Sequence, residues 1–372
     1  ARRVIESVKM KVFLDTNVFF KNWYVDNPNF KWMFRYLNNE QEELLLSELV
    51  VLEVENIRNR QRDEAIAEIK KQYKNLNGLS NKSVNFDNGI DIEDYDLNLI
   101  LNDKAEFIDR IDFESISHKT LVHRAFKSVK PFSGQEKGYR DSLIWLSLVE
   151  YLKSCNENEE IAFITNNKTD FFVSKNKEIR LHPDLVKDLE ENGIKSKVVP
   201  YTDLFQFVNS VIDKDDHLVD EFKLSYELDD FLMEQTEEHM ESLSKQDLSQ
   251  YFATNVFKDK ITQILDLTCE TWDGVDDTEI LSVSKISDDE AYVSCHYVVT
   301  GLDLTVAIDV IEYNQHKDDI DSISECYQVV IDHENEIANI SLGFRAWISG
   351  SLIYKVHDEL PAKLHVENVE LY

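Results

Sequence analysis

The chain of 372 residues is long enough for two domains, each with a core of its own. Hydrophobic residues make up 42% and charged residues 30%, which excludes a disordered chain, and no apolar run approaches the ~20 residues that would cross a bilayer. A net charge of −32 excludes a surface that is basic throughout, although part of the chain can still carry a basic face.

The negative charge is concentrated in the C-terminal part of the chain. Residues 206–372 contain 37 acidic and 10 basic residues, a net charge of −27, whereas residues 1–205 contain 35 and 30, a net charge of −5. The N-terminal part can therefore present a basic face to a polyanion such as nucleic acid, and the C-terminal part should repel one.

The N-terminus and the cysteines favour a cytoplasmic protein. No secretory signal is visible, because Glu6 and Lys9 interrupt the short apolar stretch near the start. The cysteines are far apart and have no CxxC spacing, which favours reduced thiols over a zinc site or a disulfide framework. They are Cys155, Cys269, Cys295 and Cys326.

Over the first 205 residues, short apolar runs alternate with helical patterns. We expect helices from about Val50, over 96–128 and over 139–154, and strands at 11–15, 43–47, 161–165 and 197–201. A polar stretch rich in Asn, Ser and Gly, residues 75–88, is expected to be a loop. Strands alternating with helices indicate a parallel sheet covered on both faces, so the predicted class is an α/β fold.

After about residue 213 the pattern changes. Residues 226–270 look helical and very acidic, and from Glu279 onward apolar residues recur at every second position. Turn residues separate these runs, at 287–290 and 300–303. We therefore predict an α+β domain with a half-exposed antiparallel sheet, and we divide the chain into domains at 1–213 and 214–372.

Four acidic side chains fall where a parallel sheet would gather them. Asp15 ends the first expected strand, Glu53 lies on the helix after the second, Asp141 begins a helix, and Asp170 follows the strand 161–165. Because ligands of such sheets bind beyond the carboxyl ends of the strands, we expect the four carboxylates in one crevice. Like charges raise one another's pKa unless a cation compensates them, and Mg²⁺ and Mn²⁺ prefer oxygen ligands. Such a site can activate a water for in-line attack on phosphorus.

Each of these carboxylates also has a purely structural interpretation. Asp15 is compatible with a turn or a helix N-cap, and Glu53 with the solvated face of its helix. Asp141 can favour the positive end of a helix dipole, and Asp170 can cap the segment that follows it. Spacing alone therefore leaves a metal site as one option among several.

Four segments, in this order, resemble the motifs of PIN-type nuclease domains. They are Val-Phe-Leu-Asp-Thr-Asn-Val at 12–18, Ser-Glu-Leu-Val-Val-Leu-Glu-Val at 47–54, Lys-Gly-Tyr-Arg-Asp-Ser-Leu-Ile-Trp at 137–145 and Ile-Thr-Asn-Asn-Lys-Thr-Asp-Phe at 164–171. The larger bacterial PIN-like branch is most similar, because it has a long helical insertion, here at about 60–130, and a His-Pro-Asp-Leu stretch, here at 182–185.

The resemblance implies a PIN-like three-layer domain over about residues 11–205 and a metal-dependent nuclease that uses Mg²⁺ or Mn²⁺. It assigns the catalytic and metal-binding roles to Asp15, Glu53, Asp141 and Asp170. It assigns supporting polar roles to Thr16, Asn17, Thr165 and Asn167. Two features depart from the compact members of the family: the insertion is longer, and the fourth motif has Asn where many relatives have an earlier Asp.

Basic side chains beside the motifs are expected to hold substrate phosphates, since phosphate contacts supply most sequence-independent affinity. They are Arg58, Lys137, Arg140 and Lys168. The alternative for each is an ordinary solvated surface residue. We expect RNA rather than DNA as substrate, cut by an endoribonuclease, and the family context points to bacterial defence or stress. The rival hypothesis is a catalytically silent PIN scaffold that binds nucleic acid or a protein partner.

The acidic C-terminal half resembles no family that we recognise. Three roles are compatible with its charge. It can be a solubilising surface, it can dock a partner protein or form a homodimer, or it can mimic nucleic acid and restrain the nuclease face.

Overall fold

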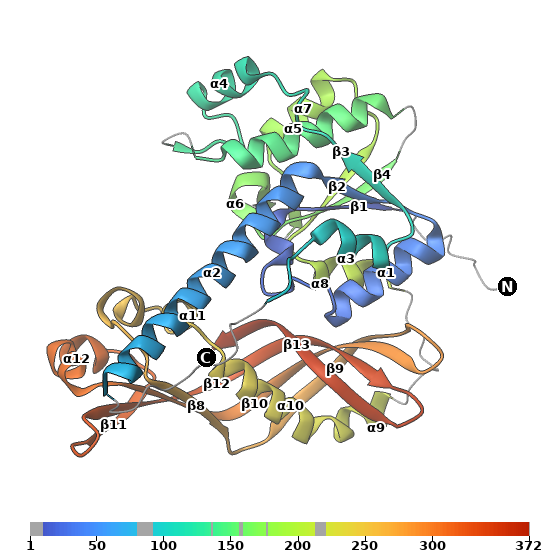
Figure 1. Cartoon of the computed structure of the whole chain (residues 1–372). Coiled ribbons are helices and arrows are strands. Elements are labelled where there is room, and N and C mark those ends of the chain that lie inside the picture. Colours follow the sequence, from blue (N-terminus) through green and yellow to red (C-terminus); the bar gives the residue numbers. More distant parts are fainter. Residues whose placement is uncertain are drawn as a thin grey trace. The chain divides into compact units, whose positions relative to one another are not determined.

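The chain folds into two compact units in a computed structural model that describes residues 10–79, 92–134, 137–155, 159–175, 178–212 and 221–371. The units are Ala1–Val211 and Ile212–Tyr372 (Figure 1). The boundary expected at 213/214 lies outside the described residues. Each unit has a core of buried apolar side chains of its own.

A parallel sheet of five strands forms the centre of the first unit. The strands are β1 (Lys11–Leu14), β2 (Leu44–Ser47), β3 (Ile108–Ile111), β4 (Glu160–Ile164) and β7 (Lys197–Tyr201). Their order is β3-β2-β1-β4-β7, and every neighbouring pair is parallel. The strand order reverses between β1 and β4, and in such sheets a crevice opens beyond the carboxyl ends of the strands at that point.

Helices cover both faces of this sheet, which confirms the predicted three-layer α/β fold. Figure 1 shows α1 (Pro28–Glu40), α3 (Leu97–Lys104) and α8 (Leu204–Val211) on one side of the sheet. On the other side lie α4 (His118–Phe126), α5 (Tyr139–Ser154) and α7 (Pro183–Glu191). Helix α5 is apolar around most of its circumference, with Leu143 to Val149 all buried, as expected for a helix enclosed within a domain.

Shorter elements complete the first unit. A 3-10 turn, η1 (Thr16–Phe19), follows β1, and the long helix α2 (Glu48–Leu79) follows β2. After β4 come the short helix α6 (Lys168–Phe171) and a hairpin of β5 (Phe172–Lys175) and β6 (Glu178–Leu181).

Two predictions for the first unit were wrong in detail. Helix α2 continues to Leu79, through part of the polar stretch expected as a loop, because residues 60–77 contain no proline or glycine to end it; residues 80–88 lie outside the described part. The helix expected over 96–128 is interrupted by β3. Ile108 and Ile111 stand three residues apart, a spacing that fits a helix as well as a short strand.

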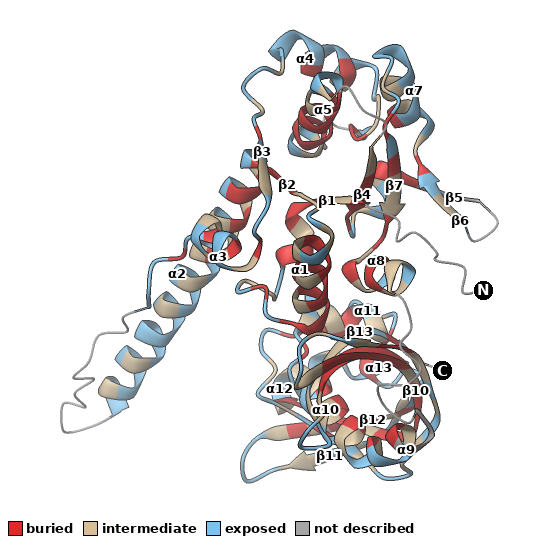
Figure 2. Cartoon of the chain, turned by 90° about the vertical axis from the view of Figure 1, so that its right-hand side faces the viewer, coloured by how far each residue is buried: buried red, intermediate tan, exposed pale blue. Residues whose placement is uncertain are grey.

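The second unit contains an antiparallel sheet of six strands that is strongly curved (Figure 2). The strands are β8 (Asp266–Thr271), β9 (Val275–Lys285), β10 (Glu290–Asp309), β11 (Cys326–Asp332), β12 (Ile337–Lys355) and β13 (Leu360–Leu371). β10 and β12 pair along almost their whole length. β8 and β9 share the free edge of β10, and β11 and β13 share that of β12.

Helices precede and interrupt this sheet. α9 (Glu221–Glu227), α10 (Asp229–Glu241), α11 (Lys245–Tyr251) and a π-helical segment, η3 (Val256–Lys260), come before β8. α12 (Val310–Gln315) and α13 (Lys317–Ile320) lie between β10 and β11. Buried residues of α10 and α11 join those of the sheet in one apolar cluster.

The antiparallel sheet was predicted, but three details of the second unit were not. Residues 266–271 form β8 rather than a helix, and β10 is buried along most of its length rather than half exposed. The turn expected at 300–303 is a bulge inside β10, where the register shifts between Val299 and Leu302. Gly301 is needed there, since a Cβ would lie 2.5 Å from the Trp272 ring.

Among the described helices, none has the length and apolarity to cross a membrane. All four cysteines are free thiols, and Cys269 and Cys295 are buried. Burial raises the pKa of both thiols to about 12, so they are unreactive at neutral pH.

Candidate active site

Asp15 stands at the carboxyl end of β1, and its carboxylate is buried in a hydrogen-bonded network. Its backbone N–H donates to the Ile164 carbonyl of β4 at 3.0 Å. This hydrogen bond fixes Asp15 at the place where the strand order of the sheet reverses. Its side chain accepts from the Thr165 hydroxyl at 2.6 Å, the Thr16 backbone N–H at 2.7 Å and the Asn17 amide at 3.0 Å. Burial nevertheless raises the pKa of the carboxyl to about 6, against the lowering effect of these bonds.

Glu53 lies on the second turn of α2 and points toward the same place. The Thr16 hydroxyl donates to one of its carboxylate oxygens at 2.8 Å. Arg140, from the start of α5, forms an ion pair with the other at 2.5 Å. Glu53 therefore joins three elements: the turn after β1, α2 and α5.

Asp141 lies in the first turn of α5, where the sequence predicted it. The helix begins after Gly138, whose φ of +97° is left-handed and favours glycine. A Cβ at Gly138 would lie 2.4 Å from the Pro131 carbonyl oxygen, so a larger residue would displace this loop. Burial, followed by repulsion from Asp15, Asp170 and Glu53, raises the pKa of Asp141 to about 7.

Asp15, Glu53 and Asp141 line one pocket of about 450 Å³. Thr16, Asn17, Lys137 and Arg140 line it as well, with Phe20, Ile57, Gly138 and Tyr139. The structure thus brings together three carboxylates from residues 15, 53 and 141, which lie on three different elements. Concentrated negative charge of this kind is unfavourable unless a cation is close to it.

Asp170 lies beside this pocket rather than in its wall. It is on α6, and the Lys130 ammonium forms an ion pair with its carboxylate at 2.8 Å. The same ammonium donates to the Thr169 carbonyl at 2.9 Å, which fixes the pair in place. Asp170 is still close enough to Asp141 to raise the pKa of that carboxyl.

The polar groups expected to support the site do contact it. Asn17 donates to Thr165 at 3.1 Å as well as to Asp15, and its own amide oxygen accepts from the Asn166 backbone at 3.0 Å. The Thr165 hydroxyl in turn accepts from the Asn167 backbone N–H at 3.0 Å. The loop after β4 is therefore tied to the loop after β1, and Asp15 is held where the two meet.

The four basic residues expected to hold phosphates occupy different environments. Lys137 and Arg140 line the pocket, and Lys168 is exposed on α6. Arg58 is buried: its guanidinium lies 5.0 Å from the centre of the Tyr95 ring and donates to the Tyr24 hydroxyl at 3.4 Å. The structure does not bring Arg58 to the pocket, and its contacts are those of a packing residue.

Comparison with known families agrees with this geometry. The family model described as PIN domain matches residues 12–171, which include the four carboxylates and their supporting loops. Residues 12–171 are a PIN domain. The match confirms the resemblance of the N-terminal motifs and gives the first unit a nuclease-type fold. No family model matches the second unit, and no curated protein or solved structure matches the chain.

The donor set of the PIN domain fits a divalent cation. PIN domains generally use metals such as Mg²⁺, and carboxylate oxygens are the ligands that Mg²⁺ and Mn²⁺ prefer. Burial, followed by repulsion from neighbouring carboxylates, raises the pKa values of Asp15 and Asp141, and a bound cation would favour their ionised forms. Yet no three acidic, His or Cys side chains among the described residues are placed to hold an ion as they stand. Arg140 and Lys130 occupy the oxygens of Glu53 and Asp170 instead.

Three roles in this site were not predicted from the sequence. Gly138 positions the start of α5, Lys130 pairs with Asp170, and Phe20, 42% exposed, presents an aromatic ring at the pocket. Tyr139, 46% exposed, also presents its ring there, as an aromatic residue of the third motif that can stack on a base. The glycine directly before a helical pattern was a usable signal. Lys130 had none, because it is 40 residues away from Asp170 along the chain.

Proposed function

We propose that the PIN domain is a Mg²⁺- or Mn²⁺-dependent nuclease that cleaves phosphodiester bonds in RNA endonucleolytically. One observation carries the proposal: Asp15, Glu53 and Asp141, from three distant segments, line a single pocket together with Lys137 and Arg140. A pocket with acidic and basic walls suits a substrate that is itself an anion and that needs a cation to approach carboxylates.

Asp15, Glu53 and Asp141 would hold the ion, with Asp170 beside them. When bound, the ion would supply an activated water and charge stabilisation for in-line displacement at phosphorus. Thr16 and Asn17 hold the carboxylates of Glu53 and Asp15 in place through hydrogen bonds of 2.8 and 3.0 Å. Held in this way, the carboxylates need little rearrangement during the reaction.

The basic residues have a second role in this proposal. The Arg140 side chain is two-thirds exposed and keeps Glu53 neutralised at 2.5 Å. If Glu53 exchanges this partner for a divalent cation, the guanidinium becomes free to contact a substrate phosphate in a bidentate manner. Lys137 is exposed at the pocket and Lys168 is exposed on α6, two residues before Asp170, and both can contact neighbouring phosphates.

A catalytically silent scaffold is the second candidate, and the ion pairs favour it. Arg140 and Lys130 already neutralise two of the four carboxylates, as they would in a domain that binds nucleic acid without cutting it. The two candidates differ in their dependence on a divalent metal. A nuclease needs Mn²⁺ at this pocket to cleave, whereas a silent scaffold binds nucleic acid equally well in EDTA.

The experiment is a cleavage assay on the full chain with labelled single- and double-stranded RNA and DNA in Mn²⁺, Mg²⁺ or EDTA. We expect internal cleavage of RNA in Mn²⁺ or Mg²⁺ and no cleavage in EDTA. Asp15→Asn should abolish cleavage, because the amide keeps the shape but not the charge that binds the cation. Asp103→Asn, an exposed carboxylate of α3 that lines neither this pocket nor any other binding site described, is the matched control. Unchanged cleavage by Asp15→Asn would assign the reaction to another group.

The biological setting is proposed from the family alone. The larger bacterial PIN-like branch, which the motifs resemble, points to a cytoplasmic ribonuclease of defence or stress. For the second unit, with its net charge of −27, we propose docking of a partner protein or a second copy of the chain. Comparison of cells with and without the intact gene under phage or nutrient stress, together with light scattering, tests both.

A further inference from the structure

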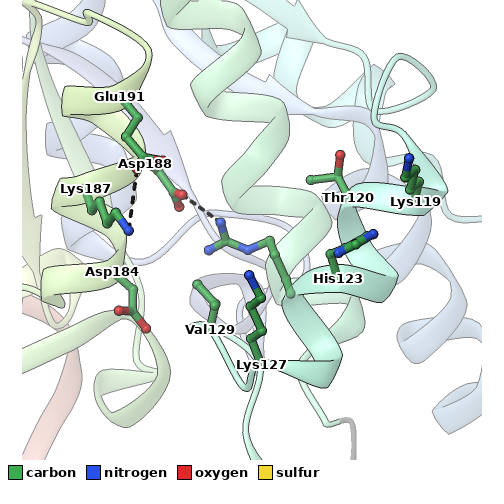
Figure 3. A pocket seen from close by; sticks show the side chains of 10 residues that line it. Lys119, Thr120, His123, Lys127, Val129, Asp184, Lys187, Asp188 and Glu191 are labelled. Atoms are coloured by element: carbon green, nitrogen blue, oxygen red, sulfur yellow. Dashed lines mark hydrogen bonds and ion pairs between the residues drawn. The ribbon is translucent and has the colours of Figure 1, made fainter.

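A second pocket, of about 420 Å³, lies between α4 and α7, apart from the carboxylate pocket. We call it the α4–α7 cleft. Figure 3 shows Lys119, His123 and Lys127 on the α4 side and Asp184 and Lys187 on the α7 side. Its other lining residues are Thr120, Arg124, Val129, Asp188 and Glu191.

The acidic side chains of the cleft already have partners. Asp188 accepts from Arg124 at 2.7 Å and from the Trp145 indole at 2.8 Å. Glu191 forms an ion pair with Lys187 at 3.5 Å, and Asp184 accepts from the Lys130 backbone at 2.9 Å.

The remaining positive charge is on α4. Lys119, His123 and Lys127 are exposed, and none of them has an ion pair with any described residue. They stand four residues apart, so they follow one side of the helix and of the turn that ends it. The cleft therefore offers two free ammonium groups, with an imidazole between them, to an anion.

The cleft also contains a buried arginine, Arg124, so it is more than a group of surface lysines. Its side chain is nine-tenths buried in the floor of the cleft. One guanidinium nitrogen pairs with Asp188 and another donates to the Lys130 carbonyl, but the buried Nε has no hydrogen-bond partner in the described structure. An arginine held in this way balances the charge of Asp188 and leaves one buried N–H donor unused beside the two lysines.

An aromatic side chain stands beside the charged row. Phe126 is 79% exposed, although a phenylalanine gains by burial. It is the last residue of α4 and follows His123 by three residues, a spacing that puts the two on one side of the helix, at the margin of the cleft rather than in its lining. Cationic groups next to an exposed ring are the combination with which proteins bind single-stranded nucleic acid: charges contact phosphates, and rings stack on bases.

One residue connects the cleft to the candidate active site. The backbone N–H of Lys130 donates to Asp184, a wall residue of the cleft, while its ammonium pairs with Asp170 at 2.8 Å. The cleft thus begins where the row of carboxylates ends. A strand lying in the carboxylate pocket and continuing past Asp170 can therefore extend toward the cleft.

We propose that the α4–α7 cleft is a second binding site for the substrate, holding the phosphates of single-stranded RNA upstream or downstream of the cut bond through Lys119 and Lys127, with Phe126 stacking on a base. The proposal rests on the nuclease function above for its substrate. It adds a footprint longer than the carboxylate pocket and predicts a preference for long chains.

Binding is measured separately from cleavage, so the two proposals can fail separately. The full chain carrying Asp141→Asn is titrated with a fluorescent uridine oligomer of about 20 nucleotides, alone and with Lys119→Glu/Lys127→Glu. The dissociation constant should rise at least about tenfold, and the slope of log affinity against log salt should fall by about 1.4, for two lost phosphate contacts. Lys70→Glu/Lys74→Glu, exposed lysines of α2, is the control of equal charge and should change affinity less.

The stacking part has its own variant. Phe126→Ala should weaken binding of the uridine oligomer and leave binding of inorganic polyphosphate unchanged, since polyphosphate has no bases. Cleavage is measured with Mn²⁺ in a chain that keeps Asp141. There, Lys119→Glu/Lys127→Glu should lower kcat/KM for the long oligomer but not for one of about three nucleotides.

Three results would decide against the cleft. Equal affinities of Lys119→Glu/Lys127→Glu and the α2 control would overturn it, and so would equal losses on short and long substrates. Competition by poly-glutamate as strong as that by poly-uridine would instead indicate docking of an acidic protein. The wild-type chain can also bind RNA through Lys119 and Lys127 and yet cleave none. That result would support RNA binding in the cleft and overturn the proposed nuclease function.

Discussion

At the scale of single residues, charge in the carboxylate pocket works against stability. Asp141 has a pKa of about 7 because burial and three neighbouring carboxylates disfavour its ionised form. The folded state therefore binds a proton at Asp141 more tightly than the unfolded chain, in which the pKa is near 3.8. The stabilisation that proton binding at Asp141 contributes is complete below about pH 4 and is lost as the pH rises through about 7.

Neutralising Asp141 should consequently stabilise the protein without metal. In EDTA at pH 8, the free energy of unfolding of Asp141→Asn is expected to exceed that of the wild type by about 1–2 kcal/mol, after allowance for solvent screening. This gain should raise Tm by roughly 2–6 °C. At pH 4.5 the difference should shrink, because the wild-type carboxyl is then mostly protonated. Differential scanning calorimetry at both pH values measures this. Added Mn²⁺ should stabilise only the wild type, and a Tm of Asp141→Asn below that of the wild type in EDTA would contradict the argument.

Arg58 is a second case in which one residue's environment decides its role. Its guanidinium is enclosed by Tyr95 and Tyr24 on α2's inner side, whereas Arg60, two residues later, is 63% exposed. Burial behind two aromatic rings suits packing and not phosphate contact.

Arg58→Ala is therefore expected to destabilise the fold by about 1–3 kcal/mol, through lost packing against the Tyr95 ring and the lost hydrogen bond to the Tyr24 hydroxyl. Arg60→Ala is the matched control and should change stability by less than about 0.5 kcal/mol. Urea unfolding monitored by circular dichroism gives both values. A loss of RNA affinity in folded Arg58→Ala, without loss of stability, would restore Arg58 as a phosphate contact.

At the scale of elements, the start of α5 determines where Asp141 and Arg140 point. Gly138 begins the helix in a left-handed conformation, packed directly against the Pro131 carbonyl. Neither the conformation nor the space allows a side chain, so the loop before α5 and the helix itself are held at one distance. Asp141 reaches the pocket because of this contact.

Gly138→Ala should lower both stability and cleavage. The new methyl group would overlap the Pro131 carbonyl at 2.4 Å, and the backbone would be strained besides, so we expect a loss of about 2–4 kcal/mol and a marked loss of kcat as Asp141 shifts. Gly134→Ala, in the same loop with no atom within 4 Å of the added Cβ, is the control and should be near neutral. Thermal unfolding and the cleavage assay measure both effects. Wild-type activity in Gly138→Ala would show that α5 can start elsewhere.

At the scale of the whole molecule, the two units differ strongly in net charge. The unit from residue 212 onward carries −27 of the net −32, whereas the PIN unit carries only −5 and has exposed basic side chains at the carboxylate pocket and in the α4–α7 cleft. Polyanions are repelled by the first and attracted locally by the second.

A fragment of residues 1–211 is therefore expected to bind single-stranded RNA at least as tightly as the full chain. It forms a compact unit with its own parallel sheet and core, and circular dichroism checks that it folds alone. Its affinity should fall steeply with salt, because phosphate contacts release counterions. Fluorescence anisotropy over a salt series measures this. Faster cleavage by the fragment would indicate that the acidic unit restrains the nuclease, and a folded fragment that loses RNA binding would assign recognition to the acidic unit.

The sequence by itself determined the strands β1, β2, β4 and β7, the helix α5 and the motif positions of Asp15, Glu53, Asp141 and Asp170. These are local features: buried strands are continuously apolar, and a motif keeps its residues together along the chain. The four-residue β3 was missed because its spacing also fits a helix, and the bulge in β10 because its glycine looks like a turn.

Only the tertiary structure decided which charges meet. Thr165 and Asp15 are 150 residues apart, Arg124 and Asp188 are 64 apart, and Lys130 and Asp170 are 40 apart. A basic side chain can be a free phosphate ligand, the partner of a carboxylate or a packing residue. Its role depends on the groups that the folded chain places within about 4 Å of it, because Coulomb and desolvation energies change steeply over that distance. Composition and periodicity contain no such information, and for that reason the pairing of Lys130, the burial of Arg58 and the α4–α7 cleft emerged only from the folded chain.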